Sequence, residues 1–233
     1  MNIYVTSGHR TGSMHITFSL ARILDYQVTS GIPCFTRRTG ADEHMITPMA
    51  AQTLFLLDRM VFHTHIKGTH GNVFFLEKAE MPVLITVRNL FDVMMSLKEK
   101  IEKGNHINGV PCPIPWTNFS EDDKWRWLAL NAVPWELQFY VSWARCILNT
   151  RWVLYERFYA DEVAGMIKIL NWLDLPVDEG RIAAILKVDK TNFNVGVSGR
   201  GVKACPDFAK DIVYSQIDAW GSPFKEKMLR HLT

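Results

Sequence analysis

A segment near the start of the chain has the composition of an anion-binding loop. Residues 7–14 contain Gly8, Gly12 and the basic Arg10, and they lie between the β-branched run 2–6 and apolar residues at helical spacing. Backbone N–H groups and the helix dipole converge on an anion at such a helix start, and an arginine adds a charge-assisted hydrogen bond. We interpret the segment as a candidate phosphate-binding loop. A structural turn with an incidental arginine is the alternative.

The nucleoside-triphosphate form of this loop, G-x-x-x-x-G-K-[ST], does not match the segment. Gly8 lies only four residues before Gly12, and Ser13 stands where that motif has its lysine. A magnesium-dependent P-loop phosphotransferase is therefore kept only as an alternative function.

A second candidate anion site follows the clearest strand pattern of the sequence. Residues 83–87 form a nearly continuous apolar run, which is typical of a strand covered on both faces. Arg88 lies at its end, and Ser96 lies eight residues further on, about two turns into a predicted helix over 90–101. Taken alone, a solvated strand end and a neutral helix residue explain these side chains. Because two candidate anion sites follow two strands of one sheet, a role in anion binding is favoured over a purely structural one.

Strands alternate with helices along the chain, which predicts an α/β fold with a P-loop-type parallel sheet of about four or five strands flanked by helices. The predicted strands are residues 2–6, 32–35, 61–66, 83–87 and 152–155. We expect a single domain over 1–233. Ligands of such sheets bind at the carboxyl ends of the strands, which here are followed by residues 7–14, 36–44, 67–71 and 88–96.

The composition excludes several classes of protein. At 48% hydrophobic and 21% charged residues, the chain is neither disordered nor a multi-span membrane protein. Its 26 basic and 24 acidic residues give a net charge of +2, which disfavours nucleic acid as a partner. The four cysteines are widely spaced, no apolar run approaches about 18 residues, and the first six residues do not resemble a signal peptide. We expect a cytoplasmic protein that does not bind membranes.

In its two anion motifs the sequence resembles the 3′-phosphoadenosine 5′-phosphosulfate (PAPS)-dependent sulfotransferases. Residues 7–14 are similar to that family's 5′-phosphosulfate loop, although His9 stands where proline is common. Residues 87–96 are similar to its 3′-phosphate motif, in which Arg88 and Ser96 would clamp the phosphate. The residues that the first motif implies for binding the phosphosulfate are Arg10, Thr11, Gly12, Ser13 and Met14.

Two later segments extend the resemblance over nearly the whole chain. Residues 152–158 are similar to the family's strand that ends in Tyr-Glu, which implies that Tyr155 lies near the nucleotide. Residues 197–202 resemble the late glycine-rich phosphate loop and imply Arg200 and Gly201 as binding residues. The Arg-Lys-Gly run of many members is absent there, so Arg200 is expected to substitute for it.

The resemblance also implies catalytic residues. Residues 66–71 resemble the family's Lys-Thr-His segment, with one extra residue. This implies that His70 is the general base, since the pKa of histidine lies near neutrality, and that Lys67 and Arg10 balance negative charge on the moving sulfonate. A loop histidine with a single hydrogen bond is the simpler interpretation of His70.

Other titratable residues offer alternatives. Some family branches use a carboxylate after the second strand, so Asp42 or Glu43, beside His44, is a rival base. His63 and His65 have a two-residue spacing that can suggest a metal, but no further ligands lie nearby in the sequence, so we disfavour a metal site.

The function implied by the resemblance is in-line transfer of a sulfonate from PAPS to a hydroxyl or amine of a small-molecule acceptor. The product nucleotide would be 3′-phosphoadenosine 5′-phosphate (PAP), and no metal is required. A non-catalytic nucleotide-binding module of the same fold is a further alternative. The resemblance also implies that residues 105–145 form a helical and loop lid over the acceptor site. The tryptophans of this lid could form an aromatic wall for the acceptor, although core packing is favoured for most of them; they are Trp116, Trp125, Trp127, Trp135 and Trp143.

Overall fold

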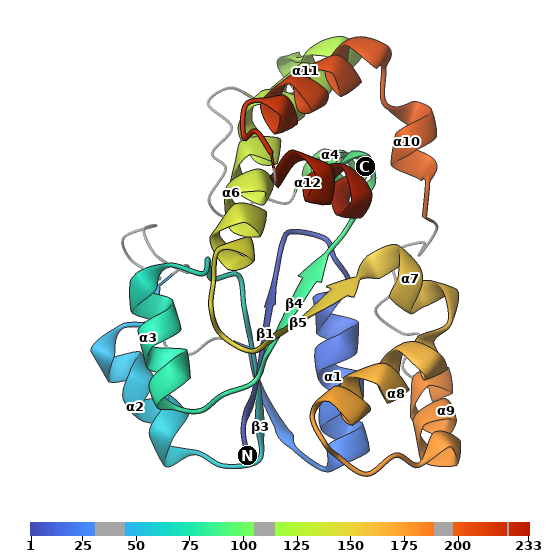
Figure 1. Ribbon diagram of the computed structural model, residues 1–233. Coiled ribbons are helices and arrows are strands. Elements are labelled where there is room, and N and C mark those ends of the chain that lie inside the picture. The colour runs from blue at the N-terminus through green and yellow to red at the C-terminus, as the bar shows by residue number, and fades with distance from the viewer. Residues whose placement is uncertain (31–44, 105–114, 189–197, 223) are drawn as a thin grey trace.

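A five-stranded parallel sheet forms the centre of the structure, a computed structural model that describes residues 1–30, 45–104, 115–188, 198–222 and 224–233 (Figure 1). The strand order is β2-β3-β1-β4-β5, with every neighbouring pair parallel. The predicted α/β class is therefore confirmed. The strands are β1 (Ile3–Ser7), β2 (Gln27–Ser30), β3 (Met60–Thr64), β4 (Val83–Val87) and β5 (Thr150–Leu154).

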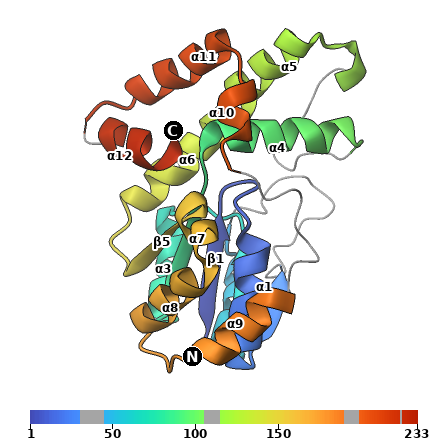
Figure 2. The same cartoon turned by 90° about the vertical axis from the view of Figure 1, so that its right-hand side faces the viewer.

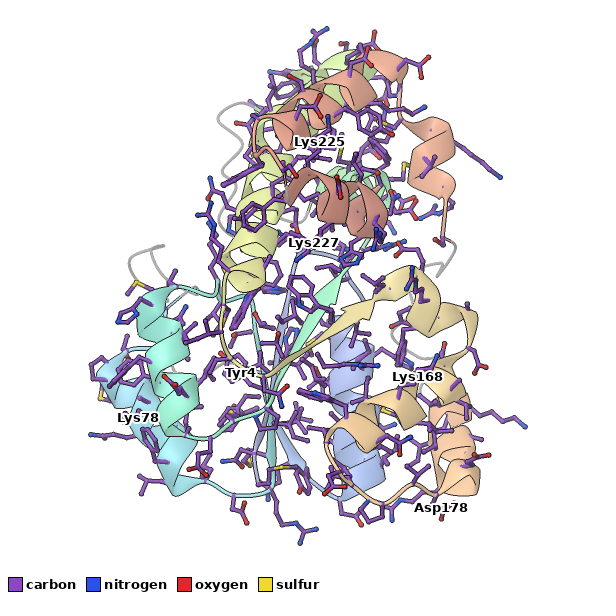
Figure 3. All side chains as sticks on the ribbon, in the orientation of Figure 1. Tyr4, Lys78, Lys168, Asp178, Lys225 and Lys227 are labelled. Atoms are coloured by element: carbon purple, nitrogen blue, oxygen red, sulfur yellow. The ribbon has the colours of Figure 1, made fainter. Side chains whose placement is uncertain are left out.

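Alternating side chains of the central strands enter two separate apolar cores. In β1, Ile3 and Val5 belong to one core, whereas Tyr4 belongs to the other and is fully buried inside the molecule (Figure 3). The first core lies under α1 (Ser13–Leu24), α8 (Glu162–Trp172) and α9 (Glu179–Val188), and the second under α2 (Pro48–Leu56) and α3 (His70–Lys78). Burial on both faces explains why these strands are apolar at consecutive positions.

A second group of helices lies beyond the carboxyl ends of the strands (Figure 2). It consists of α4 (Leu90–Glu102), η1 (Trp116–Asn118), α5 (Glu121–Trp127), the π-helical turn η2 (Leu128–Ala132), α6 (Val133–Ala144), α10 (Arg200–Ala204), α11 (Asp207–Asp218) and α12 (Phe224–Leu232). The five tryptophans of residues 105–145 are at most 9% exposed, which confirms core packing as their main role. None of the helices in the described ranges has both the length and the apolarity needed to cross a bilayer.

Several predicted boundaries differ from the structure. The strand expected at 32–35 lies outside the described residues, and β2 occupies Gln27–Ser30 instead. The strand expected at 61–66 is Met60–Thr64, and the residues after it include the start of α3 at His70. The short helix α7 (Tyr155–Ala160) follows β5 directly, so Tyr155 begins a helix instead of ending a strand. Short helices of this kind lack the long periodic pattern that identifies a helix in sequence.

The C-terminal part of the chain is fastened to α4 through a buried carboxylate. Asp92, which is 2% exposed, accepts hydrogen bonds from the backbone N–H groups of Gly199 at 2.7 Å and Gly201 at 2.6 Å. A Cβ on Gly201 would collide with the carbonyl group of Phe91, so only glycine permits this approach. Residues 198–201 are therefore held against the same helix that carries Ser96.

We expect Asp92→Ala to lower the free energy of unfolding by about 3 kcal/mol, because two backbone N–H groups lose their acceptor in a buried place. Urea denaturation measures the change. The matched control is Asp122→Ala on the exposed side of α5, which should stay within about 0.5 kcal/mol of the parent protein. Equal losses in the two variants would contradict the proposed role of Asp92.

Candidate active site

The loop between β1 and α1 has a strained, tightly supported backbone. Ser7 ends β1 and Ser13 begins α1, and between them Arg10 has φ 58° and Gly12 has φ 70°. A left-handed conformation is ordinary for glycine but costly for arginine, and such strain is typical of functional sites. The hydroxyl of Tyr159 donates to the carbonyl of Gly12 at 3.1 Å and fixes the loop from outside.

The hydroxyl side chains of this loop are used to hold its shape. Thr11 Oγ1 lies 2.8 Å from Thr86 Oγ1 in β4, and Ser13 Oγ donates to Ser7 Oγ at 3.0 Å. Both side chains are buried, whereas Met14 is 36% exposed on the first turn of α1. Any anion held here by residues 11–14 would therefore meet backbone N–H groups at the helix start, which is the usual arrangement at such sites.

The structure brings together the two anion motifs predicted from the sequence. Arg10 Nε donates to Ser96 Oγ at 2.8 Å, and Arg88 Nη1 donates to the carbonyl of Arg10 at 3.1 Å. The guanidinium of Arg88 also lies 4.1 Å from the centre of the Tyr155 ring. These four residues therefore form one continuous basic corner, not two separate pockets.

The positive charges of this corner are close together and partly buried. Burial and the positive charge of Arg88 lower the pKa of Arg10 from its ordinary value. Arg88 Nε is buried without a hydrogen-bond partner among the described residues, and the Asp92 carboxylate is 4.0 Å from Arg88 Nη2. A buried donor with no partner is costly, and a phosphate oxygen would relieve that cost.

Arg200 is bound to a carboxylate. Its Nη1 and Nη2 donate to the two oxygens of Glu99 at 2.7 and 3.2 Å, which lowers the pKa of Glu99 and raises that of Arg200. Gly201 follows it in the first turn of α10. The sequence offered no means of predicting this ion pair, which joins positions 101 residues apart.

Two histidines at the end of β3 support the loop. His63 Nε2 lies 2.7 Å from Ser13 Oγ, and His65 Nδ1 lies 3.0 Å from the carbonyl oxygen of Ser7. Because a carbonyl oxygen only accepts, Nδ1 of His65 carries the hydrogen, and Nε2 is the ring nitrogen that can take up a proton. The predicted base, His70, is an exposed residue at the start of α3. The sequence analysis considered His65 only for a metal site, so its hydrogen bond to Ser7 was not predicted.

Lys67 lies beside α6, near the Trp135 ring that packs on His9. Its Nζ donates to Gln138 Oε1 of α6 at 2.8 Å and lies 5.5 Å from the centre of a Trp135 ring, and that ring packs on His9 at 4.2 Å. Burial lowers the pKa of Lys67, and the Glu136 carboxylate opposes that effect. An easily reached ammonium group therefore stands next to the loop, on the side of α6.

Solved structures place this arrangement in a known fold, although no protein-family model and no curated protein sequence matches the chain. Mouse sulfotransferase SULT7A1 complexed with PAP matches with a TM-score of 0.70 and 14% identity, covering 99% of this chain and 88% of that one. The chain has the sulfotransferase fold. Retinol dehydratase in complex with androsterone and inactive cofactor PAP has a TM-score of 0.68, 12% identity and coverages of 95% and 81%. Sulfotransferase STF9 from Mycobacterium avium has a TM-score of 0.51, 12% identity and coverages of 94% and 76%.

Some candidates in this sulfotransferase fold lie beyond what the structure describes. The rival bases Asp42 and Glu43, with His44, fall in residues 31–44, outside the described ranges. Within those ranges no group of three histidine, cysteine, aspartate or glutamate side chains is arranged to hold a metal ion. His63 and His65 instead hydrogen-bond to serines of the loop.

The burial of the His63 imidazole predicts how the free energy of unfolding changes with pH. Burial lowers the pKa of His63 to about 3, so between pH 6.5 and 3 the unfolded chain binds a proton that the folded chain does not. Stability is therefore lost as pH falls, by about 2 kcal/mol from this residue between pH 7 and pH 5. His63→Asn, which cannot titrate, should remove that part of the loss in urea denaturation at the two pH values.

The matched control for this measurement is His70→Asn, because His70 is exposed. It should retain the pH dependence of the parent protein. If His63→Asn lost as much stability on acidification as the parent, the neutral state of His63 would be contradicted.

Proposed function

We propose that this chain is a PAPS-dependent sulfotransferase that transfers a sulfonate to a hydroxyl or amine of a small-molecule acceptor. The observation that carries the proposal is the basic corner of Arg10, Arg88 and Ser96, with its unpartnered buried Arg88 Nε, in a sulfotransferase fold. Three of the matching structures contain PAP, which supports a nucleotide site at this basic corner.

Different residues of the site bind different groups of the donor nucleotide. Backbone N–H groups of residues 11–14 hold the phosphosulfate end, assisted by Arg10 and the dipole of α1. Arg88 and Ser96 hold the 3′-phosphate, and Tyr155, which already contacts Arg88, lies beside the nucleotide. Arg200 and Gly201 support the 3′-phosphate region through α10, with Glu99 keeping the Arg200 guanidinium in place.

Fixed positive charges of the protein stabilise the transition state of the sulfonate transfer. PAPS supplies the sulfonate: the acceptor atom bonds to sulfur as the bond from sulfur to the bridging phosphate oxygen breaks, and PAP departs. Arg10 and Lys67 stabilise the negative charge that moves onto the bridging oxygen, as fixed cations do in phosphoryl transfer. A histidine removes the acceptor's proton, and this chain's own cations make a metal unnecessary for the step.

His65 is the base that the geometry favours over the predicted His70. The ring of His65 is fixed against the donor loop by the Ser7 carbonyl and hydroxyl at 3.0 and 2.9 Å, and its tautomer places the basic nitrogen at Nε2. His70 is the first residue of α3, and its side chain is exposed. Positioning decides the efficiency of a general base, so His65 is the stronger candidate.

The proposed compartment is the cytoplasm. Cys146 and Cys205 are free thiols, which fits a reducing environment. The proposed partner is a small organic acceptor, by analogy with the androsterone bound in one of the matching structures.

Thermal denaturation with nucleotides tests the proposed function. At about 100 times its Kd, PAP should raise Tm by about 5 °C or more, whereas adenosine 5′-phosphate should have a much smaller effect because it lacks the 3′-phosphate. Arg88→Ala should remove the difference, and Arg126→Ala on the exposed side of α5 should keep it. Equal shifts with both nucleotides would refute the 3′-phosphate site. A larger shift with Mg·ATP would favour a phosphotransferase instead.

A pair of variants distinguishes the two candidate bases. His65→Asn should lower the rate of sulfonate transfer from labelled PAPS to a mixture of phenols, alcohols and amines by about 10²-fold or more, since a general base contributes that much. His70→Asn should stay within about twofold of the parent. The opposite result would restore His70 as the base. Undiminished PAP binding without any transfer would indicate a non-catalytic module.

A further inference from the structure

A buried histidine and glutamate form a couple at the donor loop. His9 Nδ1 lies 2.6 Å from Glu136 Oε1, and the same oxygen accepts the backbone N–H of His9 at 3.0 Å. Both side chains are at most 10% exposed. One carboxylate oxygen of α6 thus holds both the ring and the backbone of the residue that precedes Arg10.

The Glu136 carboxylate also contacts Gly8, the residue before His9. A Cβ on Gly8 would collide with Glu136 Oε2, so the carboxylate lies directly against the loop backbone. Gly8 in turn donates its N–H to the carbonyl of Thr86 in β4 at 3.2 Å. Glu136 is therefore in contact with the segment that sets the position of Arg10.

The ring of His9 is fixed from two sides. It lies 4.2 Å from Trp135 and 5.4 Å from His65, measured between ring centres. Because a carboxylate oxygen only accepts, Nδ1 carries a hydrogen, and Nε2 has no hydrogen-bond partner among the described residues. The second nitrogen of a firmly held ring is thus left for an external group.

A carboxylate is an unexpected neighbour for an anion-binding loop. A negative charge at Glu136 repels a bound phosphosulfate unless a cation intervenes, and a buried charge without a partner is costly. The positive groups around the couple are Arg10 in the loop and Lys67 after β3, but neither contacts the carboxylate that His9 contacts. An imidazolium at His9 would neutralise Glu136 and present a positive N–H at Nε2.

We propose that Glu136 positions His9, and that Nε2 of the His9 imidazolium donates a hydrogen bond to an oxygen of the sulfonate being transferred. The carboxylate fixes the ring and stabilises its charge, as an aspartate does for a catalytic histidine in other enzymes. This inference rests on the proposed function. It adds a sulfonate contact to the site on the side of α6, next to His65 and Lys67.

Calorimetric binding of two nucleotides tests the contact, since PAPS carries the sulfonate and PAP does not. His9→Phe keeps a ring for packing on Trp135 but has no donor, and should weaken PAPS binding about 10-fold with PAP changed less than about twofold. Glu136→Gln keeps the volume and removes the charge, and should weaken PAPS binding by a smaller factor. The double variant removes the buried charge altogether and should behave like His9→Phe.

The matched control is Glu162→Gln, because Glu162 also pairs with a histidine of this region, His15, at 3.3 Å. It should leave the affinities for both nucleotides unchanged. Parallel losses of PAPS and PAP affinity in the His9 and Glu136 variants would show that the couple only supports the loop, and would overturn the inference. Unchanged PAPS binding would also overturn it. A parent protein that binds neither nucleotide would refute the proposed function itself.

Discussion

Parallel strands end at the same edge of a sheet, and this constraint governs where the active-site residues meet. β1 and β4 are neighbours in register, with Ser7 opposite Thr86, so the segments that follow them must converge. Arg10 and Ser96 are separated by 86 residues along the chain, yet they form a direct hydrogen bond. This convergence leaves Arg10 in a left-handed conformation and two guanidinium groups next to each other, and both features lower the stability of the folded state.

Carboxylates around this basic corner join neighbouring segments of the chain, and one of them, Asp92, also lies 4.0 Å from Arg88 Nη2. Asp92 accepts backbone N–H groups from the C-terminal segment, Glu99 holds Arg200, and Glu136 holds His9. Each acid therefore fixes a neighbouring segment, while Arg10 and Arg88 remain available to a ligand. The arrangement separates two tasks: acids join distant parts of the chain, and arginines face the place where the nucleotide is proposed to bind.

The sequence was sufficient to predict the sheet class and the strand 83–87, because these depend on the local apolar pattern. It also placed Arg10, Arg88 and Ser96 after strands of one sheet, where the structure brings them together. It was not sufficient for the contact of His65 with Ser7, because the His63 and His65 pair suggested a metal spacing, or for the start of α3 at His70. Glu136 was missed because it is a single acid in an aromatic helix, and only the packing of α6 on the loop reveals its partner. Contacts between residues so far apart in the sequence, such as His9 and Glu136, depend on the tertiary structure.

The π-helical turn at Leu128–Ala132 has a consequence for how relatives of this protein are aligned. Such a turn contains one residue more than an α-helical turn, and each residue rotates a helix by about 100°. A relative without the extra residue would direct a different side chain of α6 toward the donor loop. An ungapped alignment through this helix would then pair Glu136 with a residue that faces elsewhere, so equivalence has to be assigned by superposition of the backbones.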